Sequence, residues 1–104
     1  MVSQKIRNKL IRYKKLLREQ SIKVTKLLLF GSHAKGEAHK HSDIDVCVIT
    51  PDVHQNPDLY RRIIRTARQI DPVMESIAIT PHDYKYNWVS PLLDQVRKTA
   101  IEIR

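Results

Sequence analysis

Three short apolar segments, each followed by a glycine or a proline, constrain the fold of this chain more than any other feature. They cover residues 24–30, 43–50 and 73–80 and are followed by Gly31, Pro51 and Pro81. Runs of this length, rich in Leu, Ile and Val and bounded by turn residues, indicate buried strands. Around them, apolar residues recur every three or four positions, which is typical of amphipathic helices. The sequence therefore predicts an α/β fold.

Three helices are expected around these strands. In the first, Ser3 is a plausible N-cap and the apolar face ends near Gln20; it consists of Val2, Ile6, Leu10, Tyr13 and Leu17. The second begins at Asn56-Pro57-Asp58, where an N-cap, a proline and an acidic residue follow one another. The third begins at Ser90-Pro91 and is expected to turn Leu93, Val96, Ala100 and Ile103 inward. The expected order is α-β-β-α-β-α, with a short mixed sheet of about three strands flanked by helices.

The chain has 104 residues, of which 41% are hydrophobic and 29% charged, so we expect residues 1–104 to form one globular domain. The formal net charge of +8 lies in the first quarter of the sequence. Residues 1–26 hold nine Lys/Arg and one Glu, whereas residues 27–104 hold ten of each sign. A local basic face can steer an acidic partner, an RNA or a nucleotide. The same charge fits a solvated helix face, and nucleic-acid binding rests on it alone.

The composition argues against several classes of protein. The longest uninterrupted apolar run is Leu27–Phe30, against about 20 residues for a membrane span, so no membrane partner is expected. No apolar stretch of a secretory signal follows the basic N-terminus. That segment is poor in serine and leads into a strand, which favours a structural helix over a cleaved transit peptide. The single cysteine, Cys47, excludes an internal disulfide and fits a cytoplasmic location.

Acidic and glycine residues gather around the first two strands. Asp43 and Asp45 point to the same face, because side chains alternate along a strand. Two adjacent carboxylates repel, and Mg²⁺, which prefers hard oxygen ligands, would remove that repulsion. Gly31 and Gly36 are the only glycines, and they permit sharp turns or close approach to a ligand, while Ser32 offers groups that suit phosphate oxygens. An isolated Asp-x-Asp pair also fits a solvated strand end.

The two halves together form a specific pattern. Gly31-Ser32-His33-Ala34-Lys35-Gly36 is followed by Ser42-Asp43-Ile44-Asp45-Val46. The spacing is neither a P-loop, since Glu37-Ala38 stands where Lys-Ser/Thr is required, nor a G-x-G-x-x-G fingerprint. It resembles the minimal nucleotidyltransferases of the DNA polymerase β-like superfamily, and the resemblance extends over nearly the whole chain.

That resemblance implies a nucleotidyltransferase fold and an assignment of the site. Asp43 and Asp45 would be catalytic and would hold Mg²⁺ in a two-metal site, and Gly31, Ser32 and Ser42 would bind the nucleotide. A third carboxylate is expected on the next strand, usually as Asp. Here that strand carries Glu75, with Asp71 just before it. We expect Glu75 to be the third catalytic and metal-binding residue, and Asp71 to be a turn residue between helix and strand, with Asp71 as the alternative third carboxylate.

Histidines near this pattern allow other assignments. His39 and His41 share the parity of the aspartates, and His-x-His can bind zinc. They lie in residues 37–42, where a polar loop is expected, and loop histidines are more often solvated. His33 and Lys35 occupy variable positions of the turn motif, where they would contact phosphate or remain exposed.

Two further features concern packing and base recognition. Tyr84, Tyr86 and Trp88 would stack a nucleotide base or pack near the last helix. Cys47 shares the parity of the aspartates and is expected to be a small core residue beneath the site.

Two functional hypotheses follow from the resemblance. In the first, the chain is an enzyme that moves an NMP, with ATP as the expected donor, to a hydroxyl group and releases pyrophosphate. In the second, it is an antitoxin that neutralises a partner by complex formation without catalysis, since such proteins are often encoded beside a helical HEPN protein. A chain this short leaves little surface to enclose a small acceptor. We therefore expect a second chain to supply the acceptor, as a tyrosine of a HEPN-type partner.

Overall fold

The computed structural model describes residues 2–104. The elements are α1 (Gln4–Glu19), β1 (Lys26–Phe30), α2 (Ser32–Lys35), β2 (Ile44–Ile49), a 3₁₀ turn η1 (Val53–Gln55), α3 (Pro57–Ile70), β3 (Met74–Ile79), α4 (Pro81–Tyr86), α5 (Pro91–Thr99) and β4 (Ile101–Glu102). The strands form one mixed sheet in the order β3-β2-β1-β4. β2 pairs in parallel with β3 and antiparallel with β1, and β4 pairs antiparallel with β1. Within residues 2–104 no helix is long and apolar enough to span a membrane.

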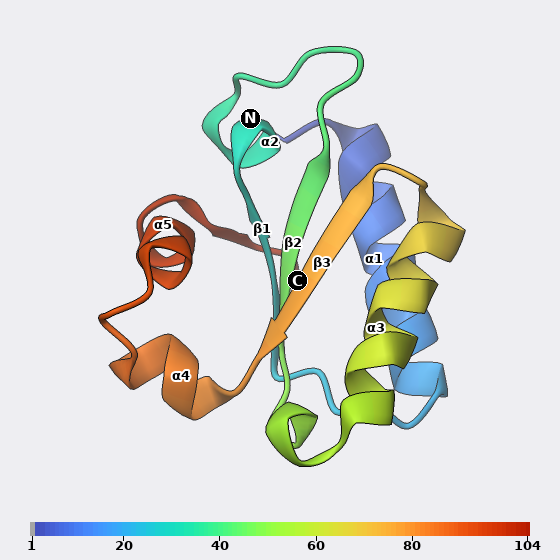
Figure 1. The fold of residues 1–104 in the computed structure, drawn as a ribbon. Coiled ribbons are helices and arrows are strands. Elements are labelled where there is room, and N and C mark those ends of the chain that lie inside the picture. The colour runs from blue at the N-terminus through green and yellow to red at the C-terminus, as the bar shows by residue number, and fades with distance from the viewer. Residues whose placement is uncertain (1) are drawn as a thin grey trace.

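Helices cover the sheet on both faces (Figure 1). α1 and α3 pack on one face, where Leu29, Val46 and Met74 are fully buried. α4 and α5 lie on the other face, where Cys47 and Ile49 pack against Val96 of α5. The central strand β2 is therefore apolar on both faces along most of its length, which a strand covered by helices requires.

The predicted α/β fold and the helix starts are confirmed. The side chains of Ser3, Asn56 and Ser90 each accept a hydrogen bond from a backbone N–H three residues further on, at 3.2, 3.2 and 3.3 Å. These N-caps satisfy donors that the first helical turn leaves free. The first helix ends at Glu19 and is capped by Gln20, at the predicted position.

Three details of the predicted order are wrong. The sheet has four strands, not about three, and the predicted order omits two short helices, α2 and α4. The last helix ends at Thr99, so Ala100 and Ile103 do not belong to it. Ile103 is nevertheless fully buried, because residues 101–102 pair with β1 and its N–H donates to the Leu27 carbonyl at 2.8 Å. An open edge of β1 offers unpaired backbone groups, and pairing with them outweighs the helical spacing of the apolar residues.

Hydrogen bonds of the Tyr13 side chain connect α1 to α3 and β3. Its side chain is fully buried, and its hydroxyl group donates to the Ile63 carbonyl at 3.0 Å and hydrogen-bonds Ser76 Oγ at 2.9 Å. Burial raises the pKa of this phenol above its ordinary value. The hydroxyl therefore stays protonated and provides a polar link between the helical layer and the sheet.

We expect Tyr13→Phe to lower the free energy of unfolding by about 1–3 kcal/mol, because it removes the hydrogen bonds of the buried hydroxyl group to the Ile63 carbonyl and to Ser76. Urea denaturation followed by circular dichroism measures this. Tyr86→Phe is the matched control, since Tyr86 is 57% exposed, and should change stability by less than about 0.5 kcal/mol. Equal effects of the two substitutions would show that the Tyr13 hydroxyl does not stabilise the core.

Candidate active site

A sharp turn joins β1 to α2 at Gly31. Its backbone has φ +73° and ψ −152°, a conformation open almost only to glycine. The Gly31 carbonyl accepts hydrogen bonds from the N–H groups of Ala34 and Lys35, both at 3.1 Å, and so begins the single turn of α2. Gly36 ends that turn in the left-handed conformation, with φ +74°. Both glycines singled out in the sequence are therefore needed for the backbone path around Ser32.

Asp45 lies directly beside this turn. In the sheet it pairs with Phe30 of β1 on one side and with Glu75 of β3 on the other. A Cβ at Gly31 would overlap Oδ2 of Asp45 and approach its Cγ to 3.2 Å. The absence of a side chain at Gly31 is thus what lets the turn pack against the carboxyl group.

Negative charge accumulates around Asp45. The pKa of Asp45 is raised, first by burial and then by the nearby carboxylates of Asp43 and Glu75, while His33 opposes the shift. The three carboxylates that the sequence selected therefore lie close enough to influence one another. They come from the loop before β2, from β2 itself and from β3.

An open cleft of about 480 Å³ lies over the turn and the two aspartates. It is lined by Gly31, Ser32, Lys35, Glu37, His39, His41, Ser42, Asp43, Asp45 and Gln95. Five of these are the predicted residues Gly31, Ser32, Ser42, Asp43 and Asp45. Glu75 is exposed and is not in the lining.

Sequence reasoning missed Gln95. It reaches the cleft from α5, some 50 positions after Asp45, and a glutamine on a helix carries no signal in the sequence. Its spacing from the apolar residues Leu93 and Val96 shows only that it lies off the buried face of the helix.

The structure separates the two alternatives for the third carboxylate. Asp71 caps α3 and turns toward α1, where its Oδ2 lies 2.5 Å from Nζ of Lys9. Its Oδ1 accepts the Val73 N–H at 3.0 Å, and these contacts, with Lys9 first, lower the pKa of Asp71. Asp71 is therefore a turn residue, as expected, whereas Glu75 stands opposite Asp45 in the sheet.

The other residues that the sequence singled out near the cleft are Ser42, the two loop histidines and Cys47. Ser42 closes a turn with His39, accepting its N–H on Oγ at 2.9 Å. His39 and His41 are exposed in the loop, as expected for a polar segment. Cys47 is fully buried beneath Asp45, and burial raises the pKa of its thiol to about 12.

The three aromatic residues near the last helix lie apart from the cleft. Trp88 is 69% exposed, and the Arg97 guanidinium sits 4.2 Å from the centre of its ring. Arg97 also donates to the carbonyls of Tyr84 and Asn87, at 2.8 and 2.6 Å. These contacts connect the 84–88 segment to α5, and Tyr84, Tyr86 and Trp88 do not line the cleft.

The donor set fits Mg²⁺ in its chemistry. Asp43 and Asp45 offer hard carboxylate oxygens, and burial of Asp45 among like charges favours a bound cation. Within residues 2–104 no three His, Cys, Asp or Glu side chains are arranged to hold a metal ion by themselves. Mg²⁺ commonly uses one or two carboxylates and completes its shell with substrate phosphates and water. The zinc alternative at His39 and His41 gains no support from this arrangement.

Gly31→Ala should lower the free energy of unfolding by about 1–3 kcal/mol through its backbone conformation and further through overlap with Asp45. Urea denaturation measures the loss. Gly36→Ala provides the control, because Gly36 is exposed and needs only the left-handed conformation, with a cost of about 1–2 kcal/mol. Equal losses in both variants would mean that the Asp45 contact does not restrict position 31.

The raised pKa of Asp45 predicts a pH effect on stability. Because the folded state holds the Asp45 proton more tightly than the unfolded state, the contribution of Asp45 to stability falls as pH rises through the window between the two pKa values. Asp45→Asn should remove this pH-dependent contribution and so raise the free energy of unfolding at neutral pH. Urea denaturation at several pH values, with a chelator present, measures the difference from the parent chain. Asp52→Asn, at an exposed position, should leave the pH profile unchanged; a profile equally unchanged by Asp45→Asn would contradict the assignment.

The amino-acid sequence of the chain matches those of known proteins. Residues 10–102 match the family model of the nucleotidyltransferase domain. A candidate protein adenylyltransferase of Methanocaldococcus jannaschii is 30% identical over 83 residues, which cover 78% of this chain and 80% of that protein. The protein adenylyltransferase MntA of Shewanella oneidensis is 43% identical over 49 residues, but these cover 47% of this chain and only 33% of that protein.

A solved structure agrees with these matches. The crystal structure of a toxin–antitoxin with AMP-PNP superposes with a TM-score of 0.65 at 26% identity, covering 94% of this chain and 72% of the other. The fold, the glycine turn beside Asp43 and Asp45, and the sequence match over residues 10–102 all indicate the same family. The chain belongs to the nucleotidyltransferase domain family and is a nucleotidyltransferase.

Proposed function

We propose that the chain transfers AMP from ATP to a hydroxyl group on a second protein. The observation that carries this proposal is that the Gly31-Ser32 turn and the carboxylates of Asp43 and Asp45 line one cleft. A turn that suits phosphate and carboxylates that suit a cation are what phosphoryl and nucleotidyl transfer need. Two relatives named protein adenylyltransferases and a structural neighbour with AMP-PNP support AMP as the group transferred.

The turn would hold the phosphates that leave as pyrophosphate. Gly31 has no side chain to keep them at a distance, and the Ser32 hydroxyl makes no hydrogen bond to other groups within residues 2–104. Lys35, which is exposed in the cleft lining, adds positive charge on the same side. Ser42 and Gln95, which also line the cleft, would orient the nucleotide.

Asp43 and Asp45 would hold Mg²⁺, with Glu75 as the third ligand on the acceptor side. When bound, Mg²⁺ neutralises phosphate charge and favours ionisation of the acceptor hydroxyl. In the reaction the acceptor oxygen forms a bond to the α-phosphorus, the bond from that phosphorus to the bridging oxygen breaks, and pyrophosphate leaves. The exposed Glu75, next to Asp45 in the sheet, would take the acceptor proton.

The acceptor is proposed to be a tyrosine of a HEPN-type helical partner. The cleft is open to solvent, so a second chain would complete the site. The toxin–antitoxin neighbour supports a toxin as that chain. We also propose that residues 1–104 form one domain, since the family model spans residues 10–102. The use of ATP and the buried free thiol of Cys47 suit the reducing cytoplasm.

The alternative is neutralisation of the partner by complex formation without catalysis. It draws on the same toxin–antitoxin neighbour. The two hypotheses differ in what they require of Asp45, because a protein that only masks its partner does not need a carboxylate packed against a glycine turn.

We expect the chain, mixed with its proposed HEPN-type partner, Mg²⁺ and α-labelled ATP, to label that partner. ATP labelled on the γ-phosphate should not, because that phosphate leaves with pyrophosphate. Asp45→Asn keeps the shape of the side chain but removes its charge, and should lower labelling about 100-fold or more. Gel autoradiography and mass spectrometry, which shows the added AMP, provide the readout.

Asp52→Asn, which removes an exposed carboxylate outside the cleft, should label the partner like the parent chain. Calorimetric titration with MgATP should show weaker binding to Asp45→Asn and unchanged binding to Asp52→Asn. Labelling that survives Asp45→Asn, or that goes to a small molecule without the partner, would contradict the proposal. Neutralisation of the partner by Asp45→Asn without labelling would establish the masking alternative.

A further inference from the structure

Two helices, α1 and α3, carry all of the excess positive charge. Together they hold eleven of the 19 Lys/Arg residues and two of the 11 Asp/Glu residues, a net charge of +9. The eight Lys/Arg and nine Asp/Glu residues elsewhere give a net charge of −1. The two helices are 37 residues apart in the sequence, from the end of one to the start of the other, yet both lie on the same face of the sheet (Figure 1).

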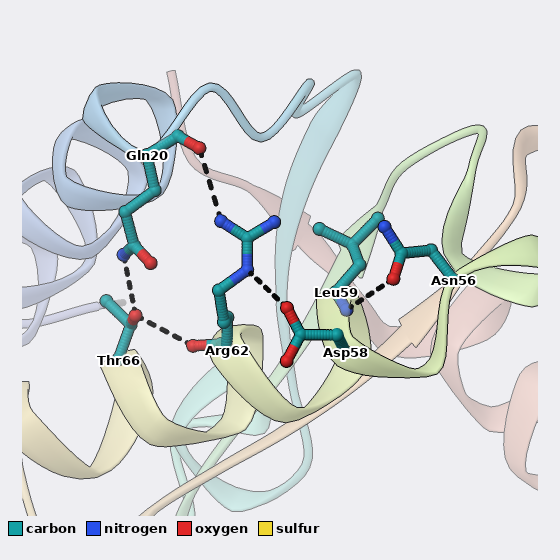
Figure 2. A network of polar contacts seen from close by, with 6 residues as sticks. All are labelled: Gln20, Asn56, Asp58, Leu59, Arg62 and Thr66. Carbon is teal, nitrogen blue, oxygen red and sulfur yellow. Dashed lines mark hydrogen bonds and ion pairs between the residues drawn. The ribbon is translucent and has the colours of Figure 1, made fainter.

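Polar contacts hold the two helices in a fixed relation (Figure 2). Nε2 of Gln20 donates to Oγ1 of Thr66 at 2.8 Å, and that hydroxyl donates to the Arg62 carbonyl, also at 2.8 Å. The Arg62 guanidinium reaches back to the Gln20 carbonyl at 3.4 Å and lies 3.4 Å from Oδ2 of Asp58. The basic side chains of α1 and α3 therefore form one surface, which we call the basic layer.

Most cations of the basic layer are available to a ligand. Within residues 2–104 only Lys9 and Arg62 of the layer form ion pairs, with Asp71 and Asp58. The other nine have no acidic partner there. Seven of them are exposed on the two helices: Lys5, Arg12, Lys15, Arg18, Arg61, Arg65 and Arg68.

We propose that the basic layer binds the phosphate backbone of double-stranded RNA. Unpaired cations gain affinity from polyphosphate by releasing its counterions, without requiring any apolar contact. The arginines of α3 can each form two hydrogen bonds to one phosphate. The ligand is thus a polyanion with regularly spaced phosphates.

The surface disfavours other ligands. A protein interface has an apolar centre, whereas the large exposed apolar side chains of α1 and α3 are only Ile11 and Ile64, at 44% and 37% exposure within the described residues. Single strands stack on aromatic residues, but the exposed Tyr86 and Trp88 belong to the segment on the opposite face of the sheet.

The width of the basic layer favours RNA over DNA. The layer is two helices, about 20 Å across, and does not enter the major groove of B-form DNA, which is about 12 Å wide. A-form RNA is recognised by its shape and phosphates across a shallow minor groove. Because no residue of α1 or α3 lines the candidate cleft, RNA on the basic layer leaves the nucleotide site free.

Fluorescence anisotropy with a labelled RNA duplex of about 20 base pairs tests the proposal. With about four phosphate contacts, binding should weaken about 100-fold between 50 and 200 mM salt. Arg61→Gln/Arg65→Gln should weaken binding about tenfold or more at 50 mM salt and lower the salt slope by about 2. Lys40→Gln/Lys85→Gln removes the same charge from exposed positions outside the basic layer and should bind RNA like the parent chain.

Circular dichroism and MgATP titration show whether each variant retains its fold and nucleotide site, so that a failure of the basic layer is distinguishable from a failure of the proposed enzyme. Unchanged RNA binding by Arg61→Gln/Arg65→Gln, or equal loss in the lysine control, overturns the proposal. Equal affinity for single-stranded RNA or for a DNA duplex of the same sequence overturns the assignment to double-stranded RNA. Tighter binding of poly-glutamate than of RNA identifies the layer as a surface for an acidic protein.

Discussion

The close contact between the Gly31 backbone and the Asp45 carboxyl group connects the two halves of the candidate site. Phe30 pairs with Asp45 across β1 and β2, so the residue after Phe30 must turn over the Asp45 side chain. Only a residue without Cβ has room there, and only glycine adopts φ +73° with ψ −152° at low cost. The turn that suits phosphate and the carboxylate that suits a cation are thereby placed side by side by the register of two strands.

The central strand β2 divides the molecule into a supporting face and a reactive face. Ile44, Val46 and Val48 pack under α1 and α3. On the other face the strand is apolar at Ile49 and Cys47, which α5 covers, and acidic at Asp45, which lines the open cleft. The buried half holds the backbone rigid, and the exposed half leaves the carboxylates open to a ligand. A rigid strand is a better base for such side chains than a loop.

Charge is distributed across the sheet in the opposite way. The face of the carboxylates is locally negative, as the raised pKa of Asp45 reflects, whereas the helical layer behind it carries a net charge of +9. Some of that positive charge has a structural use, since Lys9 holds the Asp71 turn and Arg62 bridges α1 and α3. None of the unpaired remainder lines the cleft, which makes a separate ligand the simplest use of it.

The sequence alone determined the features that depend on neighbouring residues. The strand segments follow from short apolar runs that end at Gly or Pro, the helix starts from Ser3, Asn56 and Ser90, and the closeness of Asp43 to Asp45 from their separation of two positions. Tertiary structure decided what depends on distant residues. The Lys9–Asp71 ion pair spans 62 positions and separates Asp71 from Glu75, pairing with β1 ends the last helix at Thr99, and α5 brings Gln95 to the cleft. The positive charge of α3 could not be recognised from the sequence for the same reason. Residues 27–104 have no net charge, because acidic residues on other surfaces balance the arginines of α3. Local periodicity carries no information about register or about which helices share a face, and both are settled only when the layers pack.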